Sequence, residues 1–403
     1  MRIGFIISLF FIHFVGFSSP TLQTDREISN VTADFSFGQK VIFQARINPP
    51  SGLQAIFLYI QPEGQSTRLV TPVSSPSGEI VMNYDLRQNP IRPFTKINYW
   101  YQATFPDGST LESGKFWFDY IDNRYKWLTA KEDAFQVYWY RGDMAFGQML
   151  LNVTKTGLKS AQSFLPISPP FPLKIYVYAS TGELQNALQL SKQPWVAGRA
   201  NPDLGVILLS IPSGPDGRLE MERQIPHEIM HILQFQKTGP GYKYIPLWLV
   251  EGSASLAELY PSPDYQRALN KAVESDALLP ISKLCDSFPV DASSAFLAYA
   301  ESASFVKYLH QNYGSSKLVA LVERYQDGIG CQEGVNVIFE KSLADLDYDW
   351  QQKTLGVNKE LAAFQNLSPY LLLLLLLLLI PFTGGILLVH KSTNNTRSID
   401  VRS

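Results

Sequence analysis

Cysteine and histidine are both scarce in this chain of 403 residues, which contains two cysteines and five histidines. Because the cysteines form no C-x-x-C pair, a zinc finger is excluded. Charge of either sign is not in excess either, since 34 lysine and arginine residues stand against 36 aspartate and glutamate residues. Without a basic surplus or a basic stripe, the composition gives no support to nucleic-acid binding. The sequence sets no oligomeric state.

What the sequence does contain is two apolar segments, one at each end. Residues 1–18 combine one arginine, an apolar run and small residues after it, which is typical of a secretory signal peptide; an uncleaved anchor helix is the alternative. Residues 369–389 include nine consecutive leucines and are long enough to cross the hydrocarbon core as a transmembrane helix. The tail at 390–403 carries a surplus of basic residues, so the positive-inside rule makes it cytoplasmic. We therefore expect a single-pass protein of the cell membrane whose main part is extracytoplasmic.

The two cysteines, Cys285 and Cys331, both lie in the part that is expected outside the cytoplasm. In an oxidising compartment a disulfide is the natural interpretation, and in the chain-entropy model closing the loop contributes about 4 kcal/mol. Spacing alone cannot prove that the bond forms, so two free buried thiols remain the alternative.

The front part of the chain has the pattern of β-strands. Apolar side chains recur at every second position in the segments Val41–Ile47 and Ile97–Phe105, and the turn signal at 106–108 leads into a further strand that runs through Phe118. This alternation predicts a β-sandwich domain at residues 25–120. Its many aromatic residues are best explained by core and cross-strand packing, with a ligand platform as the alternative.

The following part, residues 121–356, changes from strand patterns to helical ones. Strands and helices first alternate, and from Leu219 to about Leu355 the pattern is mostly helical. The predicted strands are 135–140, 173–178 and 205–210, and the predicted helices are 144–163 and 182–190. The expected fold is therefore α+β: a β-sandwich, then a domain with a mixed α/β half and a helical half, then a juxtamembrane linker at 357–368.

The motif that carries chemistry is His-Glu-Ile-Met-His at residues 227–231. Apolar spacing around it predicts a helix, with Pro226 in the first turn. Residues i and i+4 of a helix share a face, so His227 and His231 can bind one metal ion, while Glu228 can reach metal-bound water without ligating the metal. In a chain with so few histidines, a chance H-E-x-x-H is rare. Two solvated or core histidines are the alternative.

A tetrahedral zinc site needs a third protein ligand and an open position. A metzincin is excluded, because Gln234 and Lys237 occupy the positions of its glycine and third histidine. A second helix-like segment instead carries Glu251, far enough after His231 for a turn and an antiparallel helix that returns to the metal. The alternative for Glu251 is a residue on a helix surface.

At these residues the chain resembles the gluzincins, the thermolysin-like clan also called the peptidase MA superfamily, and more narrowly the bacterial peptidase MA family metallohydrolases. The resemblance covers about residues 120–355. It rests on His-Glu-Ile-Met-His-Ile-Leu-Gln at 227–234, Trp-Leu-Val-Glu-Gly at 248–252 and the segment 299–309. It implies a gluzincin-like catalytic domain, Zn²⁺ as the cofactor, Glu251 as a zinc ligand, and a protein or peptide substrate.

The resemblance also implies further roles. A tyrosine or histidine farther along often stabilises the tetrahedral intermediate, which points to Tyr299, with Tyr308 or His310 behind it. The strand Gly205–Ser210 resembles the edge strand along which gluzincins bind extended substrate. Glu258 is a candidate to orient one of the two histidines, with a plain helix-surface role as the alternative. The Gly-x-Met-Glu-Asn signature of the alanyl aminopeptidases is absent, so exopeptidase specificity has no support.

Together these features predict a membrane-anchored, extracytoplasmic zinc metallopeptidase. Glu228 would take the proton of zinc-bound water as it attacks a peptide carbonyl and pass that proton to the leaving amine, while zinc and Tyr299 stabilise the oxyanion. One alternative is a surface binding or adhesion protein with an inactive peptidase-like domain. Another is a non-peptide metallohydrolase on the same scaffold.

Overall fold

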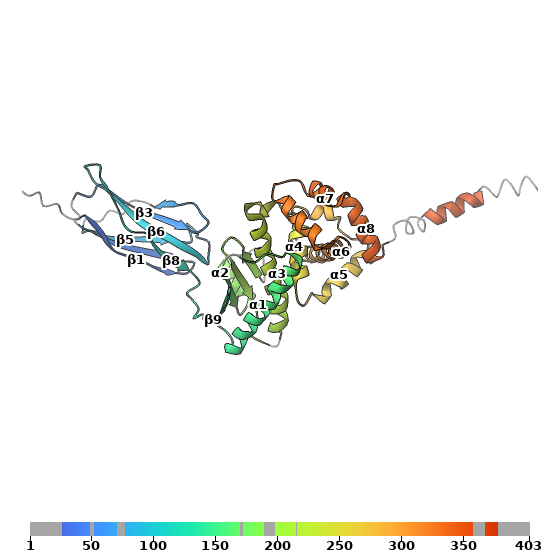
Figure 1. Ribbon diagram of the computed structural model, residues 1–403, viewed down its shortest axis with the longest axis horizontal. Coiled ribbons are helices and arrows are strands. Elements are labelled where there is room, and N and C mark those ends of the chain that lie inside the picture. Colours follow the sequence, from blue (N-terminus) through green and yellow to red (C-terminus); the bar gives the residue numbers. More distant parts are fainter. Residues whose placement is uncertain are drawn as a thin grey trace, which may run out of the picture. The chain divides into compact units, whose positions relative to one another are not determined.

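The computed structural model divides the chain into two compact units, Met1–Lys126 and Trp127–Ser403 (Figure 1). It describes residues 26–48, 52–70, 77–169, 172–188, 198–214, 216–357 and 367–377. The predicted signal peptide at 1–18 lies outside these residues, as do residues 378–389 of the predicted transmembrane segment. Residues 367–377 are helical, and among the described residues no helix has both the length and the apolar character needed to cross a membrane.

The first unit is built from two antiparallel sheets. One has the order β1-β2-β5, and the other has the order β4-β3-β6-β7, with β8 also pairing with β6. The strands are β1 (Glu27–Ser36), β2 (Lys40–Asn48), β3 (Ala55–Pro62), β4 (Arg68–Val70), β5 (Glu79–Asp85), β6 (Thr95–Thr104), β7 (Thr110–Glu112) and β8 (Phe116–Tyr120). The chain after the turn at 106–108 forms two strands where one was predicted, because β7 and β8 pair with different halves of β6.

Alternating side chains of these sheets form the core of a β-sandwich. Phe43 of β2 and Tyr99 of β6 are both buried, and their rings lie 5.1 Å apart across the two sheets. On the outer face of β6, Trp100 stacks on Tyr59 of the neighbouring strand at 5.1 Å. Packing within the core and across strands, as predicted, therefore accounts for these aromatic residues. Trp117 is an exception, with 58% of its surface exposed.

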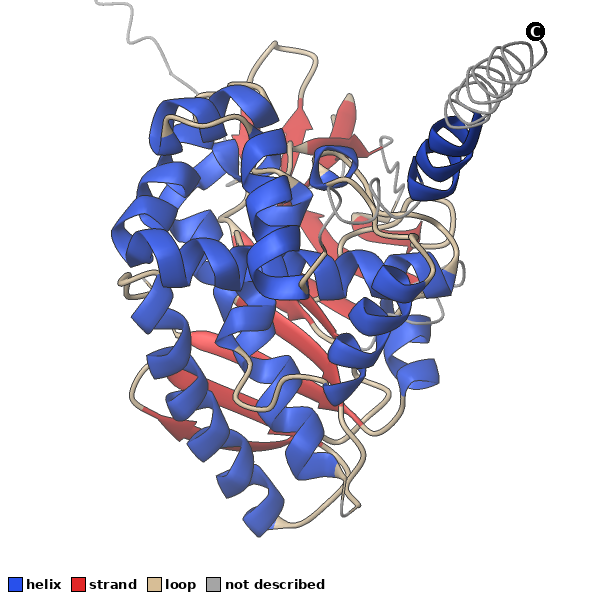
Figure 2. Ribbon diagram, turned by 90° about the vertical axis from the view of Figure 1, so that its right-hand side faces the viewer, coloured by secondary structure: helices blue, strands red, loops and turns tan. Residues whose placement is uncertain are grey.

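The second unit contains a five-stranded sheet and all the helices with labels in Figure 1. The strands are β9 (Leu128–Glu132), β10 (Phe135–Trp139), β11 (Leu173–Tyr178), β12 (Gly198–Asn201) and β13 (Val206–Ser210). The helices, blue in Figure 2, are α1 (Met144–Phe164), α2 (Thr181–Leu188), α3 (Gly217–Thr238), α4 (Leu247–Ala257), α5 (Pro263–Glu274), α6 (Ala292–Tyr325), α7 (Cys331–Phe339) and α8 (Leu343–Leu355), with the 3-10 turns η1 (Gly239–Tyr244) and η2 (Ile281–Leu284). A mixed half is thus followed by a helical half.

The sheet order, β12-β13-β11-β10-β9, corrects the prediction about the edge strand. β13 pairs in parallel with β11 and antiparallel with β12, so the segment predicted to lie at the edge is flanked on both sides. The edge strand is instead β12, the four-residue segment Gly-Arg-Ala-Asn. It was missed because it is too short and too polar to show an alternating apolar pattern. β9, at the opposite edge, was missed as well.

The helical half buries a carboxyl group, that of Glu301 in α6. One of its oxygens accepts a hydrogen bond of 2.9 Å from the backbone N–H of Leu279. Burial raises the pKa of Glu301 to about 8, the Leu279 hydrogen bond opposes the rise, and the negative charge of Asp347 adds to it. Glu301 is therefore protonated in the folded protein at neutral pH.

Candidate metal centre

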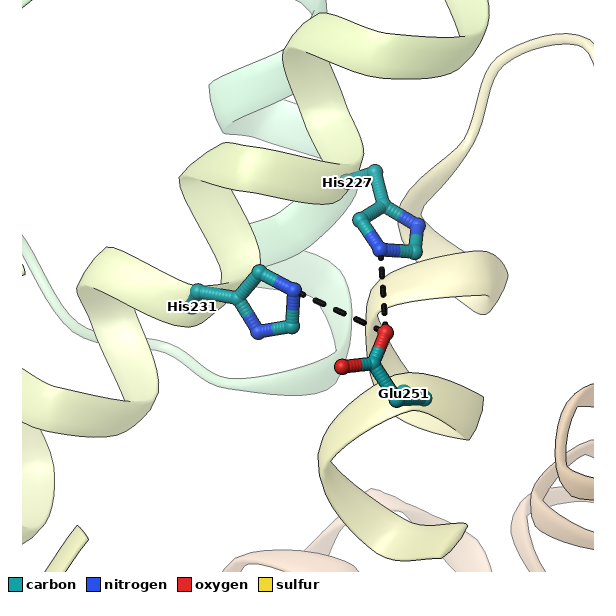
Figure 3. A group of neighbouring side chains, drawn as sticks. All are labelled: His227, His231 and Glu251. Carbon is teal, nitrogen blue, oxygen red and sulfur yellow. Dashed lines mark ion pairs between the residues drawn. The ribbon is translucent and has the colours of Figure 1, made fainter. Parts of the chain in front are cut away.

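Two helices bring the predicted metal ligands together. His227 and His231 lie one turn apart on α3 and point toward Glu251 on α4 (Figure 3). The Oε2 atom of Glu251 is 3.3 Å from Nε2 of His227 and 3.8 Å from Nε2 of His231. One ligand atom from each of the three residues lies within 4.8 Å of the others.

This arrangement fits a zinc ion. Tetrahedral bonds of about 2.1 Å separate neighbouring ligand atoms by about 3.4 Å, which is close to the two separations from Glu251. Two imidazoles and one carboxylate are also a ligand set of catalytic zinc sites, which keep a fourth position for water or substrate. The donor atoms therefore match the ion in kind and in spacing.

The outer nitrogen of each histidine has a hydrogen-bond partner. His227 Nδ1 lies 3.0 Å from Oε1 of Glu258, whose side chain is almost fully buried. His231 Nδ1 lies 3.3 Å from Oε1 of Gln234 and 3.2 Å from the hydroxyl oxygen of Tyr242. Donation from Nδ1 to a carboxylate or amide oxygen leaves the Nε2 lone pair for the metal. The proposed orienting role of Glu258 thus has a direct structural basis at His227.

Pro226 helps to place Glu258. The helix α3 begins at Gly217, so Pro226 lies in its interior and not in the first turn as predicted. A proline has no N–H for the carbonyl four residues earlier, here that of Glu222. That carbonyl instead accepts a hydrogen bond of 2.9 Å from the N–H of Leu259, the residue directly after Glu258. The interruption of α3 therefore fixes the end of α4 beside His227.

Gln234 connects the same two helices on the other side of the centre. It is fully buried, and its Nε2 donates a hydrogen bond of 3.2 Å to the carbonyl oxygen of Val250, the residue before Glu251. Sequence reasoning used Gln234 to exclude a metzincin and as the last residue of the 227–234 motif, and assigned it no contact. Gln234 lies three residues after His231 on the same helical face, and this spacing could have predicted its contact with His231. Tyr242 gave no such signal, because it lies in the 3-10 turn η1.

Glu228 lies against the edge strand β12. Its side chain is buried, and it accepts a hydrogen bond from the backbone N–H of Ala200. A Cβ atom at Gly198 would lie only 2.7 Å from Oε1 of Glu228, so the strand and the carboxylate are in close contact. Burial raises the pKa of Glu228, against the lowering effect of the charges on His231 and His227.

The electrostatics of the ligands follow from burial and mutual attraction. For His227, burial opposes protonation, but hydrogen bonds and charge from Glu251 and Glu258 outweigh it and hold the pKa well above its usual range. For Glu251, burial alone would raise the pKa, but the positive charges of His231 and His227 lower it. In the metal-free protein a proton on His227 therefore offsets the charge of the carboxylates beside it, and a metal ion at Nε2 would take the place of that proton.

The three candidates for stabilising the oxyanion lie in different places. Burial raises the pKa of Tyr299 on α6, and the charges of Glu251 and Glu228 add to the rise. His310 instead bonds to the hydroxyl of Ser315 through Nε2 at 3.0 Å. Tyr308 and His310 line another pocket, which does not include the ligand residues. The role of Tyr299 at the oxyanion stays a prediction.

A disulfide joins Cys285 to Cys331, which confirms the interpretation of the two cysteines. The bond lies beside the start of α4. The carbonyl oxygen of Cys285 accepts a hydrogen bond of 2.8 Å from Leu247 N–H, and the sulfur of Cys331 accepts one of 3.4 Å from the indole of Trp248. The disulfide thus anchors the first turn of the helix that carries Glu251.

The part of the chain that carries these residues is similar to a known family. Residues 156–356 match the family model of the Peptidase MA superfamily. No curated protein matches the chain.

Solved structures give weaker similarities. An M1 zinc metallopeptidase from Deinococcus radiodurans has 14% sequence identity and a TM-score of 0.35, and the match covers 78% of this chain and 90% of that chain. An aminopeptidase N family protein from Idiomarina loihiensis has 9% identity and a TM-score of 0.34, with 85% of this chain and 74% of that chain covered. Similarities of this strength do not assign an activity.

Proposed function

We propose, on the premise that residues 156–356 belong to the peptidase MA superfamily, that the protein is a zinc metallopeptidase that hydrolyses peptide bonds. The observation that carries the proposal is the convergence of His227, His231 and Glu251 on one point, with the carboxylate of Glu228 beside them. An inactive peptidase-like domain has no physical need for that carboxylate.

His227, His231 and Glu251 would hold the ion. Zinc supplies Lewis acidity, which makes water a stronger nucleophile and polarises a carbonyl group. Glu258 and Gln234 keep the two imidazoles in the form that can bind it, because each accepts a hydrogen bond from an Nδ1 atom.

Glu228 is the proposed general base. It would accept a proton from the attacking water and deliver it to the nitrogen of the leaving amine. Its burial raises its pKa, which brings the carboxyl group closer to the pH at which it must both take up and release a proton. The hydrogen bond from Ala200 N–H holds it in place.

The substrate would be an extended peptide that pairs with the edge strand β12. Only one side of β12 pairs with another described strand, β13, so its other side can accept a further strand by β-augmentation. Since Gly198 and Ala200 of β12 contact Glu228, a peptide bound there would run past the base. Tyr299 is the proposed donor to the developing oxyanion.

We also propose that the enzyme is extracytoplasmic and anchored to the cell membrane by its C-terminal segment. The described leucines at 371–377 are all exposed to solvent, which leaves them available to lipid. The disulfide is the kind of bond that persists in an oxidising compartment. Carbonate-resistant sedimentation of the protein with membranes, lost when residues 369–403 are deleted, would test the anchor.

The experiment for the activity compares the wild-type protein with Glu228→Gln. Both should retain close to one zinc ion per chain by elemental analysis, because Glu228 is not a ligand. Only the wild type should cleave a random peptide library, read out by mass spectrometry. Equal cleavage by the two proteins would exclude the proposed mechanism, and the absence of zinc and cleavage in both would favour a binding protein with an inactive domain.

A further inference from the structure

Arg199 is the only charged residue of β12, the edge strand along which the substrate is proposed to bind. Its side chain is exposed, and among the described residues its guanidinium group forms no ion pair or hydrogen bond. A charge on an exposed edge hinders pairing with the sheet of another molecule, which is one explanation for this residue. A partner of opposite charge on the free side of β12 is the other.

The two faces of β12 have different surroundings, because side chains of a strand alternate between the faces of its sheet. Ala200 packs against the hydrophobic core that α3 shares with Ile207 and Leu209 of β13. Arg199 therefore projects from the opposite face, where its neighbour in the pairing of β12 with β13 is Leu208. Leu208 is apolar and fully buried, so it offers no partner to a guanidinium group. A partner for Arg199 would have to come from the free side of the strand.

A bound peptide would supply a residue at that place. Glu228 contacts Gly198 and Ala200, the residues on either side of Arg199. A peptide that pairs with β12 while its scissile bond lies beside Glu228 thus has one residue directly across from Arg199. Successive strand residues are about 3.3 Å apart, so this residue lies within two positions of the cleaved bond. Its side chain would lie on the same face as that of Arg199, with the two Cβ atoms about 5 Å apart.

A carboxylate is the group that suits this position. Opposite charges directly across two strands attract each other, and like charges repel. The guanidinium group of Arg199 can also bind a carboxylate through two parallel N–H···O bonds. Because the pair would be exposed, the gain is small and depends on ionic strength. The carboxylate would lie on the face away from Glu228, so it would not disturb the proposed base.

We propose that Arg199 is a specificity-determining residue, which selects an acidic side chain of the substrate strand within two residues of the cleaved bond. The inference rests on the proposed peptidase function and adds a substrate class to it. At low ionic strength the enzyme prefers aspartate or glutamate over a neutral residue at that position and discriminates against lysine and arginine.

The probes are phosphinic peptides, in which a phosphinate replaces the scissile amide and alanine fills the other positions. Glutamate, glutamine or lysine is placed in turn at each of the two positions on either side of the phosphinate. The affinities for the zinc-loaded full-length protein are measured by calorimetry, which needs no turnover, at low and at high ionic strength. At one position we expect glutamate to bind about two- to fivefold more tightly than glutamine, and lysine to bind more weakly by a similar factor. High ionic strength should reduce both differences.

Changes of charge at Arg199 should change the preference in a set order. Arg199→Glu should make lysine bind more tightly than glutamate at that position, and Arg199→Gln should make the three peptides bind alike. Both variants should fold normally, because the side chain is exposed. Arg141→Glu is the matched control for net charge, since Arg141 is also exposed and follows β10, three strands away from β12 in the same sheet. It should leave the preference unchanged.

The two proposals fail in different ways. If the peptides bind with affinities that do not depend on their charge at any of the four positions, or if Arg199→Glu leaves the order unchanged, Arg199 only protects the edge and the peptidase proposal stands. If no phosphinic peptide binds the zinc-loaded protein and no peptide is cleaved, the peptidase function is wrong and the selection by Arg199 with it.

Discussion

Adding a single methyl group at Gly198 should disable the proposed general base. The new Cβ of Gly198→Ala would lie 2.7 Å from Oε1 of Glu228 and 3.0 Å from Cδ2 of Leu209. An ordinary contact needs about 3.4 Å or more, so the carboxylate must move by about 0.7 Å. The strand itself need not move, because the crowded oxygen is the free end of a flexible side chain.

The expected effect is on catalysis and not on folding. Misplacing a catalytic group by a fraction of an ångström to an ångström costs up to about a hundredfold, so kcat/KM should fall by about ten- to a hundredfold. That loss corresponds to about 1.4–2.7 kcal/mol of transition-state stabilisation. Stability should stay the same or rise slightly, because alanine in a strand loses less backbone entropy on folding than glycine.

The assay measures cleavage of one peptide from the library by wild type, Gly198→Ala and Gly182→Ala. The last is the control, because an added Cβ at Gly182 meets no atom within 4 Å. Zinc content and the midpoint of unfolding are measured for all three proteins. The expected result is a loss of kcat/KM in Gly198→Ala alone, at unchanged zinc content. If this variant cleaves as fast as wild type, β12 does not position Glu228. If it loses zinc or unfolds earlier, the crowding acts on the fold and not on the base.

Three further changes test other parts of the structure. Glu258→Ala removes the partner of His227 Nδ1, so zinc affinity should fall by about ten- to a hundredfold in a chelator competition. Replacing Cys285 and Cys331 by serine should lower the free energy of unfolding by about 2–4 kcal/mol in a urea titration and weaken zinc retention, because α4 loses its anchor. For Glu301, the folded pKa of about 8 exceeds the ordinary glutamate value of 4.5, so the folded protein keeps a proton that the unfolded chain releases. Its contribution to stability is therefore complete below about pH 4.5 and is lost as pH rises toward 8, by an amount on the order of a few kcal/mol, and Glu301→Gln should remove this part of the slope in urea titrations between pH 5 and 8.

Each of these expectations has a contrary outcome. Unchanged zinc affinity in Glu258→Ala would show that the contact with His227 does not orient the imidazole. A double serine variant with full zinc retention would separate the disulfide from the metal centre. An identical pH slope in wild type and Glu301→Gln would mean that Glu301 does not hold a proton in the folded protein.

The sequence was sufficient for the parts of the site that depend on helical geometry. His227 and His231 had to share a face because they are four residues apart on a helix, and the apolar Trp-Leu-Val before Glu251 indicated a buried helix that would carry the carboxylate inward. The alternating apolar residues of β2 and β6 likewise predicted the two faces of the sandwich.

The parts that could not be predicted depend on contacts between distant segments. The sequence of Gly198–Asn201 has no pattern that predicts a strand, because its place at the sheet edge is set by pairing with β13. Tyr242 reaches His231 only because η1 turns the chain back toward α3. Pro226 was expected in the first turn of its helix because proline is tolerated there and interrupts the hydrogen-bond ladder elsewhere, but the helix begins at Gly217.

Pro226, inside α3, leaves one carbonyl oxygen of that helix free to form a hydrogen bond with the end of α4. In an uninterrupted helix the carbonyl oxygen of Glu222 would accept a hydrogen bond from the residue four positions later. Here Pro226 has no N–H to donate, and the oxygen accepts one from Leu259, just after α4. The helix that bears two of the proposed ligands and the helix that bears the third are consequently joined by a main-chain hydrogen bond that, among substitutions at Leu259, only proline would remove. Exchanging Pro226 for an ordinary residue would let the two N–H groups compete for one oxygen, and the spacing of the ligands would then depend on which of them prevails.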